Sequence, residues 1–292
     1  MINTSEGESA WLAAMCNQVV LDVIDDVVAV SNDLDAEAAE RLRVRLLEAV
    51  EPALFDVVTK VAAPVVALQP IYHVEGGTII GYEALARFGG SGNTAATFRL
   101  AAERGFGVDI EVVALAAALH RLDDVPGRTP LGVNVSAGAL ADDRIHQLLS
   151  TVDAGRLVFE LTQQSDVTDV AAIRAACRSV RAVGAVVCVD GAGRGFFQHE
   201  RILELEPEMI KIDRRIVQGC DGDEVLRGEI VGLVALSRRI GALSVGVGVE
   251  RQEELTTLSQ LGVDAVQGHL LGKPSVDLST FDQAAFPVLV AR

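Results

Sequence analysis

The chain has 292 residues, half of them are hydrophobic, and its formal net charge at pH 7 is −16. This length allows one large α/β domain, or one domain with an extension. The negative charge argues against nonspecific binding to nucleic acids or anionic membranes. It does not argue against a small anionic ligand, which senses only the local field of its pocket. It also suits a site that gathers divalent metal ions.

Cysteine usage and hydropathy both indicate a cytoplasmic protein. Four cysteines, Cys16, Cys177, Cys188 and Cys220, show no Cys-x-x-Cys spacing, so we expect reduced thiols in the core. No apolar run approaches the roughly 18 residues of a membrane span. The N-terminus also lacks a basic stretch followed by an apolar one, as a signal peptide would have. We therefore expect a cytoplasmic location and neither a nucleic acid nor a membrane as a partner.

Residues 1–62 differ from the rest of the chain. They carry 12 acidic and 4 basic residues, so their net charge of −8 is half of the total. Apolar residues recur at helical spacing on both sides of Asn32-Asp33-Leu34-Asp35, which is suited to break one helix and cap the next. We predict an acidic helical hairpin with an apolar stripe. The stripe either packs on the same chain or serves self-association or the docking of a protein partner.

Two short apolar runs follow, over residues 65–72 and 78–85, and Gly76-Gly77 lies in the turn between them. This pattern predicts a β-hairpin. Its second strand closes on the carboxylate of Glu83, and Arg87 comes four residues later. Such a strand end either presents chemistry at a sheet edge or is simply solvated, and this stretch alone does not separate the two.

From residue 64 onward, apolar strand-like runs alternate with helical patterns. The runs cover residues 131–135, 157–161, 186–189, 209–212, 243–247 and 265–266, and the main helical patterns cover 110–121, 170–183, 224–240 and 252–261. This alternation predicts a parallel sheet with helices on its outside. Together with the hairpin, the strands suffice to close a TIM-like (β/α) barrel with one antiparallel strand, formed by residues 63–292 and placing its chemistry at the carboxyl ends of the strands.

Polar side chains lie where several of these strands end. Glu83, Asn134, Glu160 and Asp190 supply oxygen atoms from four different strands, and Lys211 and Gln267 follow on two more. A ligand set of three carboxylates and one amide suits Mg²⁺ or Mn²⁺. Any one of these residues alone would more often be a solvated or capping residue. Their recurrence on successive strands predicts a metal site.

These residues carry a resemblance to a known family. Leu68-Gln69-Pro70-Ile71 and Gly81-Tyr82-Glu83-Ala84-Leu85-Ala86-Arg87 resemble the signature of the EAL domain family, bacterial phosphodiesterases that linearise cyclic di-GMP. The similarity continues in order along the chain and covers about residues 63–280.

The resemblance implies a role for each strand-end residue. Lys211 matches the lysine that helps to position the attacking water. The implied metal ligands are Glu83, Asn134, Glu160 and Asp190, and the implied ligand-binding residues are Gln69, Arg87 and Gln267.

Two positions depart from the family pattern. Gly191 replaces the second of two adjacent aspartates, and Val247 replaces the first glutamate of Glu-Gly-Val-Glu. The family's two-metal mechanism needs carboxylates on both ions. The resemblance therefore implies one remaining Mg²⁺ or Mn²⁺ site, a lost second site and a vestigial Lys211, with a rate loss on the order of 10³-fold or more. Asp213 and Glu250 belong to the family pattern in their own right, so we do not expect either to replace a lost acid.

Three hypotheses about function follow. In the first, the barrel is a catalytically silent domain that acts by binding cyclic di-GMP or a protein partner. In the second, it is a weakly active metal-dependent phosphodiesterase. In the third, the barrel only supports the N-terminal hairpin. Replacing Glu83 by Ala separates them, because it should weaken ligand binding in the first, abolish activity in the second and change nothing in the third.

Overall fold

The computed structural model describes residues 64–88, 94–103, 106–162, 169–194, 197 and 199–281. The helical hairpin predicted for residues 1–62 lies outside these ranges and stays a prediction. None of the described helices combines the length and the apolar character that a membrane crossing requires.

The chain forms two compact units. One of them includes the segment Arg87–Val113, which contains helix α3 (Thr94–Glu103) and the first half of α4 (Gly107–Leu119). In this unit Phe88, which follows strand β2, packs edge-on against Phe98 of α3 with ring centroids 5.4 Å apart. The other unit contains Val66–Ala86 and the chain from Ala114 onward, and it holds the barrel.

Eight strands close the barrel in sequence order. Strand β1 runs antiparallel to β8, with Tyr72 opposite Val266, whereas the neighbours from β2 to β8 pair in parallel. The structure therefore confirms the predicted TIM-like barrel with one antiparallel strand. The strands are β1 (Val65–His73), β2 (Ile79–Arg87), β3 (Leu131–Val135), β4 (Leu157–Leu161), β5 (Val186–Ala192), β6 (Met209–Ile212), β7 (Leu243–Val247) and β8 (Ala265–Gln267).

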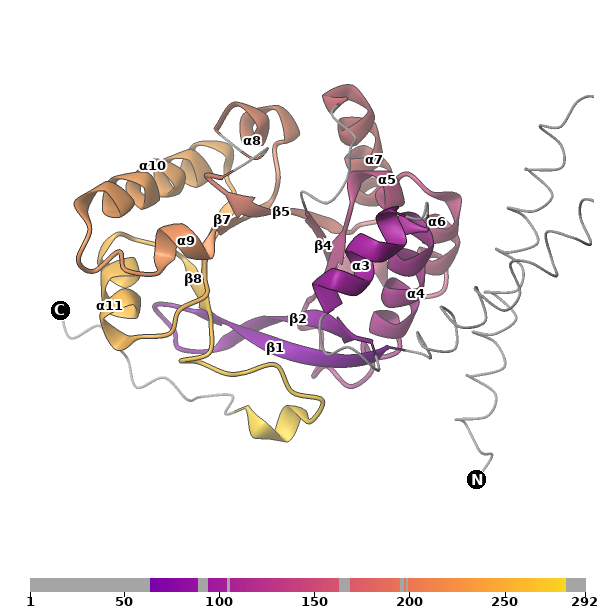
Figure 1. Cartoon of the computed structure of the whole chain (residues 1–292), viewed down its shortest axis with the longest axis horizontal. Helices are drawn as coiled ribbons and strands as arrows, with labels where there is room; N and C mark the ends of the chain where they lie inside the picture. Colours follow the sequence, from indigo (N-terminus) through magenta and orange to yellow (C-terminus); the bar gives the residue numbers. More distant parts are fainter. Residues whose placement is uncertain are drawn as a thin grey trace, which may run out of the picture. The chain divides into compact units, whose positions relative to one another are not determined.

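Helices follow the strands and surround the ring, which Figure 1 views from one end. Three of the longer helices lie where the apolar periodicity predicts them, namely α7 (Val170–Ala182), α10 (Glu224–Ile240) and α11 (Gln252–Gln260). The shorter helices are α5 (Ala137–Leu140), α6 (Asp143–Leu149), α8 (His199–Leu205) and α9 (Arg214–Val217), with 3₁₀ turns η1 (Ala154–Arg156) and η2 (Leu278–Thr280). They escape prediction because one or two turns do not establish a period.

Local capping explains several of the short helices. The side chains of Ser136, Asp142 and Asp213 accept hydrogen bonds from backbone N–H groups of the first turns of α5, α6 and α9. A capping side chain satisfies an N–H group that has no partner within its helix. Ser136 and Asp213 come directly after strands β3 and β6, so the chain turns away from the sheet as soon as each strand ends.

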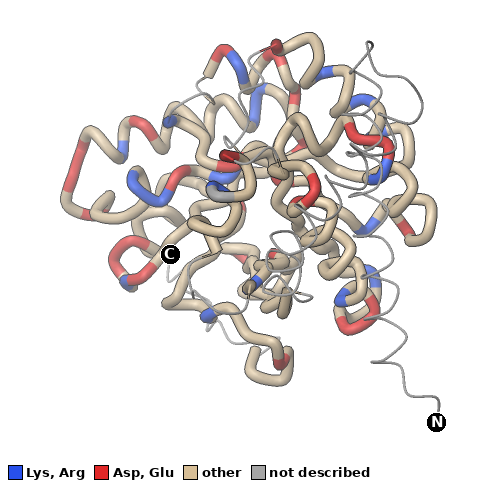
Figure 2. Tube along the Cα trace, turned by 45° about the vertical axis from the view of Figure 1, so that its right-hand side comes forward, with Lys and Arg blue, Asp and Glu red and all other residues tan. Residues whose placement is uncertain are grey.

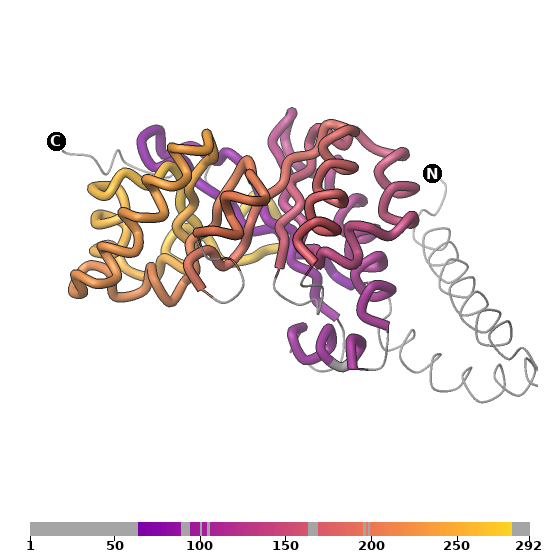
Figure 3. Tube along the Cα trace, turned by 90° about the horizontal axis from the view of Figure 1, so that it is seen from above, coloured from indigo at the N-terminus to yellow at the C-terminus, as the bar shows by residue number. Residues whose placement is uncertain are grey.

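An apolar layer lines the barrel along β6, β7 and β8, from the amino ends of these strands to the carboxyl end of β7. Buried Ile71, Val245 and Ala265 form its centre, and four partly buried residues pack against them, namely Ile80, Met209, Leu243 and Val247. Figure 1 shows the ring with β1 beside β8, and Figure 3 shows the same chain turned by 90°.

Charged residues of both signs are interspersed along the described chain (Figure 2). Many of them pair locally, as Arg181 does with Glu208 at 2.7 Å and Arg201 with Glu204 at 3.1 Å. Exposed pairs of this kind contribute only about 0–1 kcal/mol each. The charged residues buried inside the barrel are therefore better indicators of a functional site than the exposed ion pairs.

Candidate functional site

The polar residues predicted at the strand ends meet inside the barrel. The register places Asn134 on β3 opposite Glu160 on β4, and Glu83 on β2 opposite Gly132 on β3. Residues opposite each other in a parallel pair project to the same side of the sheet. Glu83, Asn134 and Glu160 consequently share one site.

The carboxylate of Glu83 lies at the centre of the hydrogen-bond network in this site. It accepts hydrogen bonds from Nδ2 of Asn134 at 2.7 Å, from Nζ of Lys211 at 2.7 Å and from Nε2 of Gln267 at 2.8 Å. Burial raises the pKa of Glu83, but the charge of Lys211 and these hydrogen bonds outweigh burial and hold its pKa below the ordinary value. Glu83 is therefore ionised at neutral pH.

Lys211 links Glu83 to a second carboxylate. Its Nζ lies 2.5 Å from Oε2 of Glu160, and the lysine side chain is only 1% exposed. Burial lowers the pKa of Lys211, but the neighbouring acids Glu160, Glu83 and Asp190 outweigh that effect and raise it above the ordinary value. The lysine therefore stays charged, and it can orient acidic groups but not act as a base.

Glu160 is completely buried. Its Oε2 contacts Lys211, while its Oε1 has no hydrogen-bond partner among the described residues. Burial and the charge of Glu83, opposed by Lys211, raise the pKa of Glu160 to about 8. A buried carboxylate oxygen without a partner costs free energy, and a cation or a donor could satisfy it.

Two glutamines extend the same network. Nε2 of Gln267 lies 3.3 Å from Oε1 of Gln69, and Nε2 of Gln69 donates to the carbonyl of Gly272 at 2.9 Å. Both side chains are buried. The network therefore brings together Gln69 from β1 and Gln267 from β8, two of the three predicted ligand-binding residues.

Asp190 lies at the edge of this network. Burial raises its pKa, the charge of Lys211 acts in the opposite direction, and Glu83 and Asp213 raise it further, so that the net shift is upward. The next residue, Gly191, has a φ of 73° and carries no side chain. Apart from the adjacent residues, the nearest atom to a β-carbon built at Gly191 is Oδ2 of Asp213, at 3.7 Å.

The carboxylate of Asp213 is already engaged. It accepts hydrogen bonds from the backbone N–H of Arg215 at 2.8 Å and from the guanidinium of Arg215 at 2.9 and 2.8 Å. These bonds lower the pKa of Asp213. Asp213 thus caps α9 and is held by Arg215.

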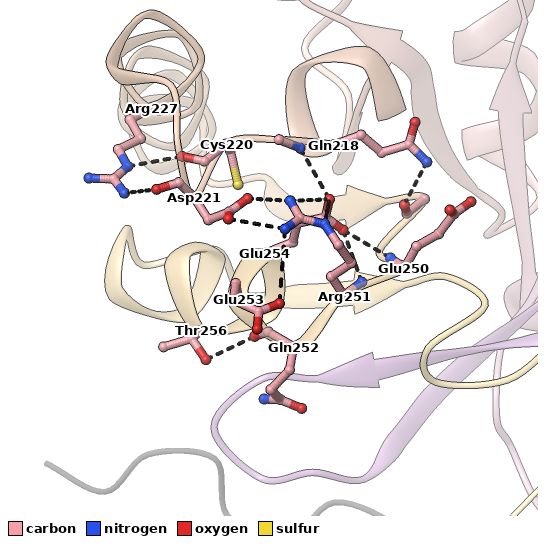
Figure 4. A network of polar contacts seen from close by, with 12 residues as sticks. Gln218, Cys220, Asp221, Arg227, Glu250, Arg251, Gln252, Glu253, Glu254 and Thr256 are labelled. Atoms are coloured by element: carbon pink, nitrogen blue, oxygen red, sulfur yellow. Dashed lines mark hydrogen bonds and ion pairs between the residues drawn. The ribbon is translucent and has the colours of Figure 1, made fainter.

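The other departure, Val247, ends β7 opposite Gln267 and packs against the apolar layer of the barrel. The turn after it is held by the buried carboxylate of Glu254 (Figure 4). That carboxylate accepts hydrogen bonds from the backbone N–H groups of Glu250 at 3.0 Å, Arg251 at 3.1 Å and Gly219 at 3.1 Å. Arg251 in turn contacts Asp221, so two loops are tied together behind the strand end.

The predicted metal donors do not form a ready cluster. Among the residues that the structure describes, no group of three or more His, Cys, Asp or Glu side chains is arranged to hold a metal ion. The ammonium group of Lys211, 2.7 Å from Glu83 and 2.5 Å from Glu160, bridges two of the three acids. Binding of a cation by the full predicted set therefore requires these side chains to move.

Arg87, the third predicted ligand-binding residue, is the exposed last residue of β2, and its role stays a prediction. Two functional candidates escaped the sequence argument. Glu254 gave no signal because Arg251, which is not a usual N-cap residue, begins the capping box that Glu254 completes, and its third backbone partner, Gly219, lies in a distant loop. Gly132 did carry a signal in the sequence, because a glycine inside a strand often marks the close approach of a ligand or of another part of the chain.

Comparison with known proteins places these residues in a family. The family model for the EAL domain matches residues 63–274 of the chain. The cyclic di-GMP phosphodiesterase PdeL of Escherichia coli K12 is 30% identical over 156 residues, which cover 51% of this chain and 43% of PdeL. The chain spans less than half the length of the curated relatives that it matches.

Two solved structures illustrate the shared fold. The PaMucR phosphodiesterase in complex with c-di-GMP superposes with a TM-score of 0.68 at 24% identity, over 78% of this chain and 97% of that one. BlrP1 of Klebsiella pneumoniae, in a manganese and c-di-GMP complex, gives a TM-score of 0.67 at 19% identity, over 83% and 71% of the two chains. With a family model that matches most of its length, a closed barrel and acids at the strand ends, the chain belongs to the EAL domain family.

Proposed function

We propose that this EAL domain is catalytically silent and acts as a regulatory module that binds cyclic di-GMP. The observation that carries the proposal is the pair of departures at the strand ends. Gly191 offers no side-chain ligand after Asp190, and Val247 turns an apolar side chain to the barrel interior. A two-metal hydrolase needs carboxylates on both ions to activate the water between them. The second ion therefore lacks its carboxylate ligands in this domain.

The parts of the site that would serve binding are retained. Gln69, Glu83 and Gln267 form one hydrogen-bonded network, and preorganised polar groups of this kind orient a ligand. The family's solved structures include complexes with c-di-GMP, such as that of PaMucR. Retention of the network without the second set of acids supports a domain that holds the dinucleotide and does not cleave it.

The remaining donors are chemically suited to one divalent cation, which they would hold after Glu83 and Glu160 have moved from Lys211. Glu83, Asn134, Glu160 and Asp190 would hold Mg²⁺ or Mn²⁺, for which oxygen ligands are suited, and the partnerless Oε1 of Glu160 is consistent with such a role. When bound, the ion would neutralise the charge of a phosphate group. Glu83 would orient that ion through the hydrogen bonds that fix its own carboxylate.

The alternative function is a weakly active phosphodiesterase. It is favoured by one observation, the approach of Asp213 to the position where Gly191 lacks a side chain. Its carboxylate could substitute for the missing acid only by giving up three hydrogen bonds with Arg215. We therefore rank this alternative second.

The test compares the native domain with the double variant G191D/V247E in a cyclic di-GMP hydrolysis assay containing Mg²⁺ or Mn²⁺. We expect the restored acids to raise turnover by about 10²-fold or more, because they supply the missing ligands. The variant V247L is the matched control, since it keeps position 247 apolar. Measurable native turnover equal to that of the double variant would contradict the proposal.

A further inference from the structure

The side chain of Glu160 occupies the space above a glycine on the neighbouring strand. A β-carbon built on Gly132 would collide with Oε1 of Glu160 and would lie 3.2 Å from its Cδ. The collision involves the far end of a side chain and not backbone atoms. Glu160 can hold its present position only because residue 132 has no side chain.

The register shows where this position lies. Glu160 is opposite Asn134, and Gly132 is two residues earlier on the same face of β3, opposite Glu83. The carboxylate of Glu160 therefore turns back from the strand end into the barrel, one layer deeper than Asn134. In agreement with this direction, Glu160 has no exposed surface, whereas Asn134 is exposed.

The inward position satisfies only half of the carboxylate. Oε2 gains the contact with Lys211 at 2.5 Å, but Oε1 has no partner among the described residues. A buried carboxyl oxygen without a hydrogen-bond partner is energetically unfavourable. The position is therefore held by Lys211 and by the space over Gly132, against a cost that an outward turn would relieve.

We propose that Gly132 is a positioning residue. The recess above it, which is the space that a side chain at position 132 would fill, lets Glu160 turn inward to contact Lys211. In this position Glu160 is kept away from a divalent cation held by Glu83, Asn134 and Asp190. The inference rests on the proposed metal-assisted binding function and adds the means by which the affinity for the metal is set. Cation binding by all four donors requires Glu160 to leave the recess and to give up Lys211. The more stable Glu160 is in the recess, the lower is the affinity of the site for the metal ion.

The variant G132A tests this role directly. Gly132 is not among the residues with positive φ, so its backbone accepts alanine, and the clash is relieved by a turn of the Glu160 side chain. We expect the affinity for Mn²⁺ to rise by about 10-fold, the lower end of the effects seen for residues that position metal ligands. The measurement is a Mn²⁺ titration without nucleotide, in which the free ion is quantified by electron paramagnetic resonance.

Two further variants make the result specific. G81A adds the same methyl group to an interior position of β2, where the nearest atoms lie at 3.5 and 4.0 Å, and it should leave Mn²⁺ affinity unchanged. The double variant G132A/E160Q should lose the gain of G132A, because an amide is a much weaker ligand than a carboxylate. Circular dichroism of each variant checks that it is folded.

Folded G132A with unchanged or weaker Mn²⁺ affinity would overturn the proposal, as would a gain that persists in G132A/E160Q. Absence of Mn²⁺ binding by every variant at millimolar concentrations would overturn it as well. The readout uses the metal alone, so it is separate from the proposed function. If the native domain fails to bind cyclic di-GMP, that function fails while the effect of Gly132 on the metal can still be observed.

Discussion

Lys211 and Glu160 form an ion pair in which Nζ and Oε2 are 2.5 Å apart and both side chains are only 1% exposed. Removing two charges from water is costly, and the pair is stable only because further groups contribute. Glu83 provides the second carboxylate for the lysine, at 2.7 Å. The site is therefore a coupled unit, and a change in one member should affect the others.

Replacement of Lys211 by Met should destabilise the domain. It leaves the buried carboxylate of Glu83 without its cation and Glu160 without its hydrogen-bond partner, and breaking a buried pair in this way typically costs about 3–5 kcal/mol. Urea unfolding of K211M against the native domain measures the loss. The exposed Lys273 provides the matched control K273M, which should change the free energy of unfolding by less than about 0.5 kcal/mol. Equal effects of the two substitutions would show that the buried pair contributes nothing.

Replacement of Glu83 by Ala should remove both stability and ligand binding. The substitution breaks three hydrogen bonds, to Asn134, Lys211 and Gln267, and we expect a loss of about 3 kcal/mol or more. Cyclic di-GMP binding in the presence of Mg²⁺ should weaken by at least about 10-fold. The control is E75A, in the exposed turn between β1 and β2. Undiminished binding by folded E83A would exclude Glu83 from the site.

The stability of the metal-free domain should depend on pH through Glu160. Its pKa rises from the ordinary 4.5 to about 8 on folding, so between these values the folded state holds more protons than the unfolded state. The free energy of unfolding should therefore fall as the pH rises from about 5 to 8, by at most about 1.4 kcal/mol per pH unit. Urea unfolding in EDTA measures the slope. E160Q, which does not titrate, should flatten it, and an identical slope in both proteins would refute the assignment.

Replacement of Glu254 by Gln should loosen the turn after β7. The amide removes the charge that binds Arg251 and keeps only part of the acceptor capacity for the backbone N–H groups of Glu250, Arg251 and Gly219. We expect a loss of about 1–3 kcal/mol in the free energy of unfolding. The adjacent E253Q is the control, because Glu253 is exposed and its ion pair with Arg251 is 4.0 Å long. Comparable losses would mean that the network in Figure 4 does not hold the turn.

The fold was predictable because a parallel barrel leaves a simple pattern. Strands covered on both faces appear as continuous apolar runs, and β4, buried throughout, is such a run. Acids and amides that interrupt or follow these runs mark the strand ends, which is why Glu83, Asn134 and Glu160 could be named in advance. Short helices such as α8 and α9 could not, because their length is below one clear period.

The internal geometry of the site was not predictable. Lys211 and Glu83 are 128 positions apart in the sequence, and strand-end placement alone does not tell whether they attract each other or share a ligand. The inward turn of Glu160 depends on the absence of a side chain at Gly132, on a different strand. Side-chain direction at such positions follows from packing between strands, which a single sequence does not specify.

The most direct test of a binding domain without catalysis is a calorimetric titration of cyclic di-GMP into the purified native protein with Mg²⁺ or Mn²⁺, followed by chromatographic analysis of the cell contents. We predict saturable binding and intact cyclic di-GMP at the end of the titration. Accumulation of the linear product at a rate near that of an active phosphodiesterase would contradict the account, because Gly191 and Val247 would then be compatible with catalysis. Absence of any binding would contradict it as well and would direct attention to a protein ligand.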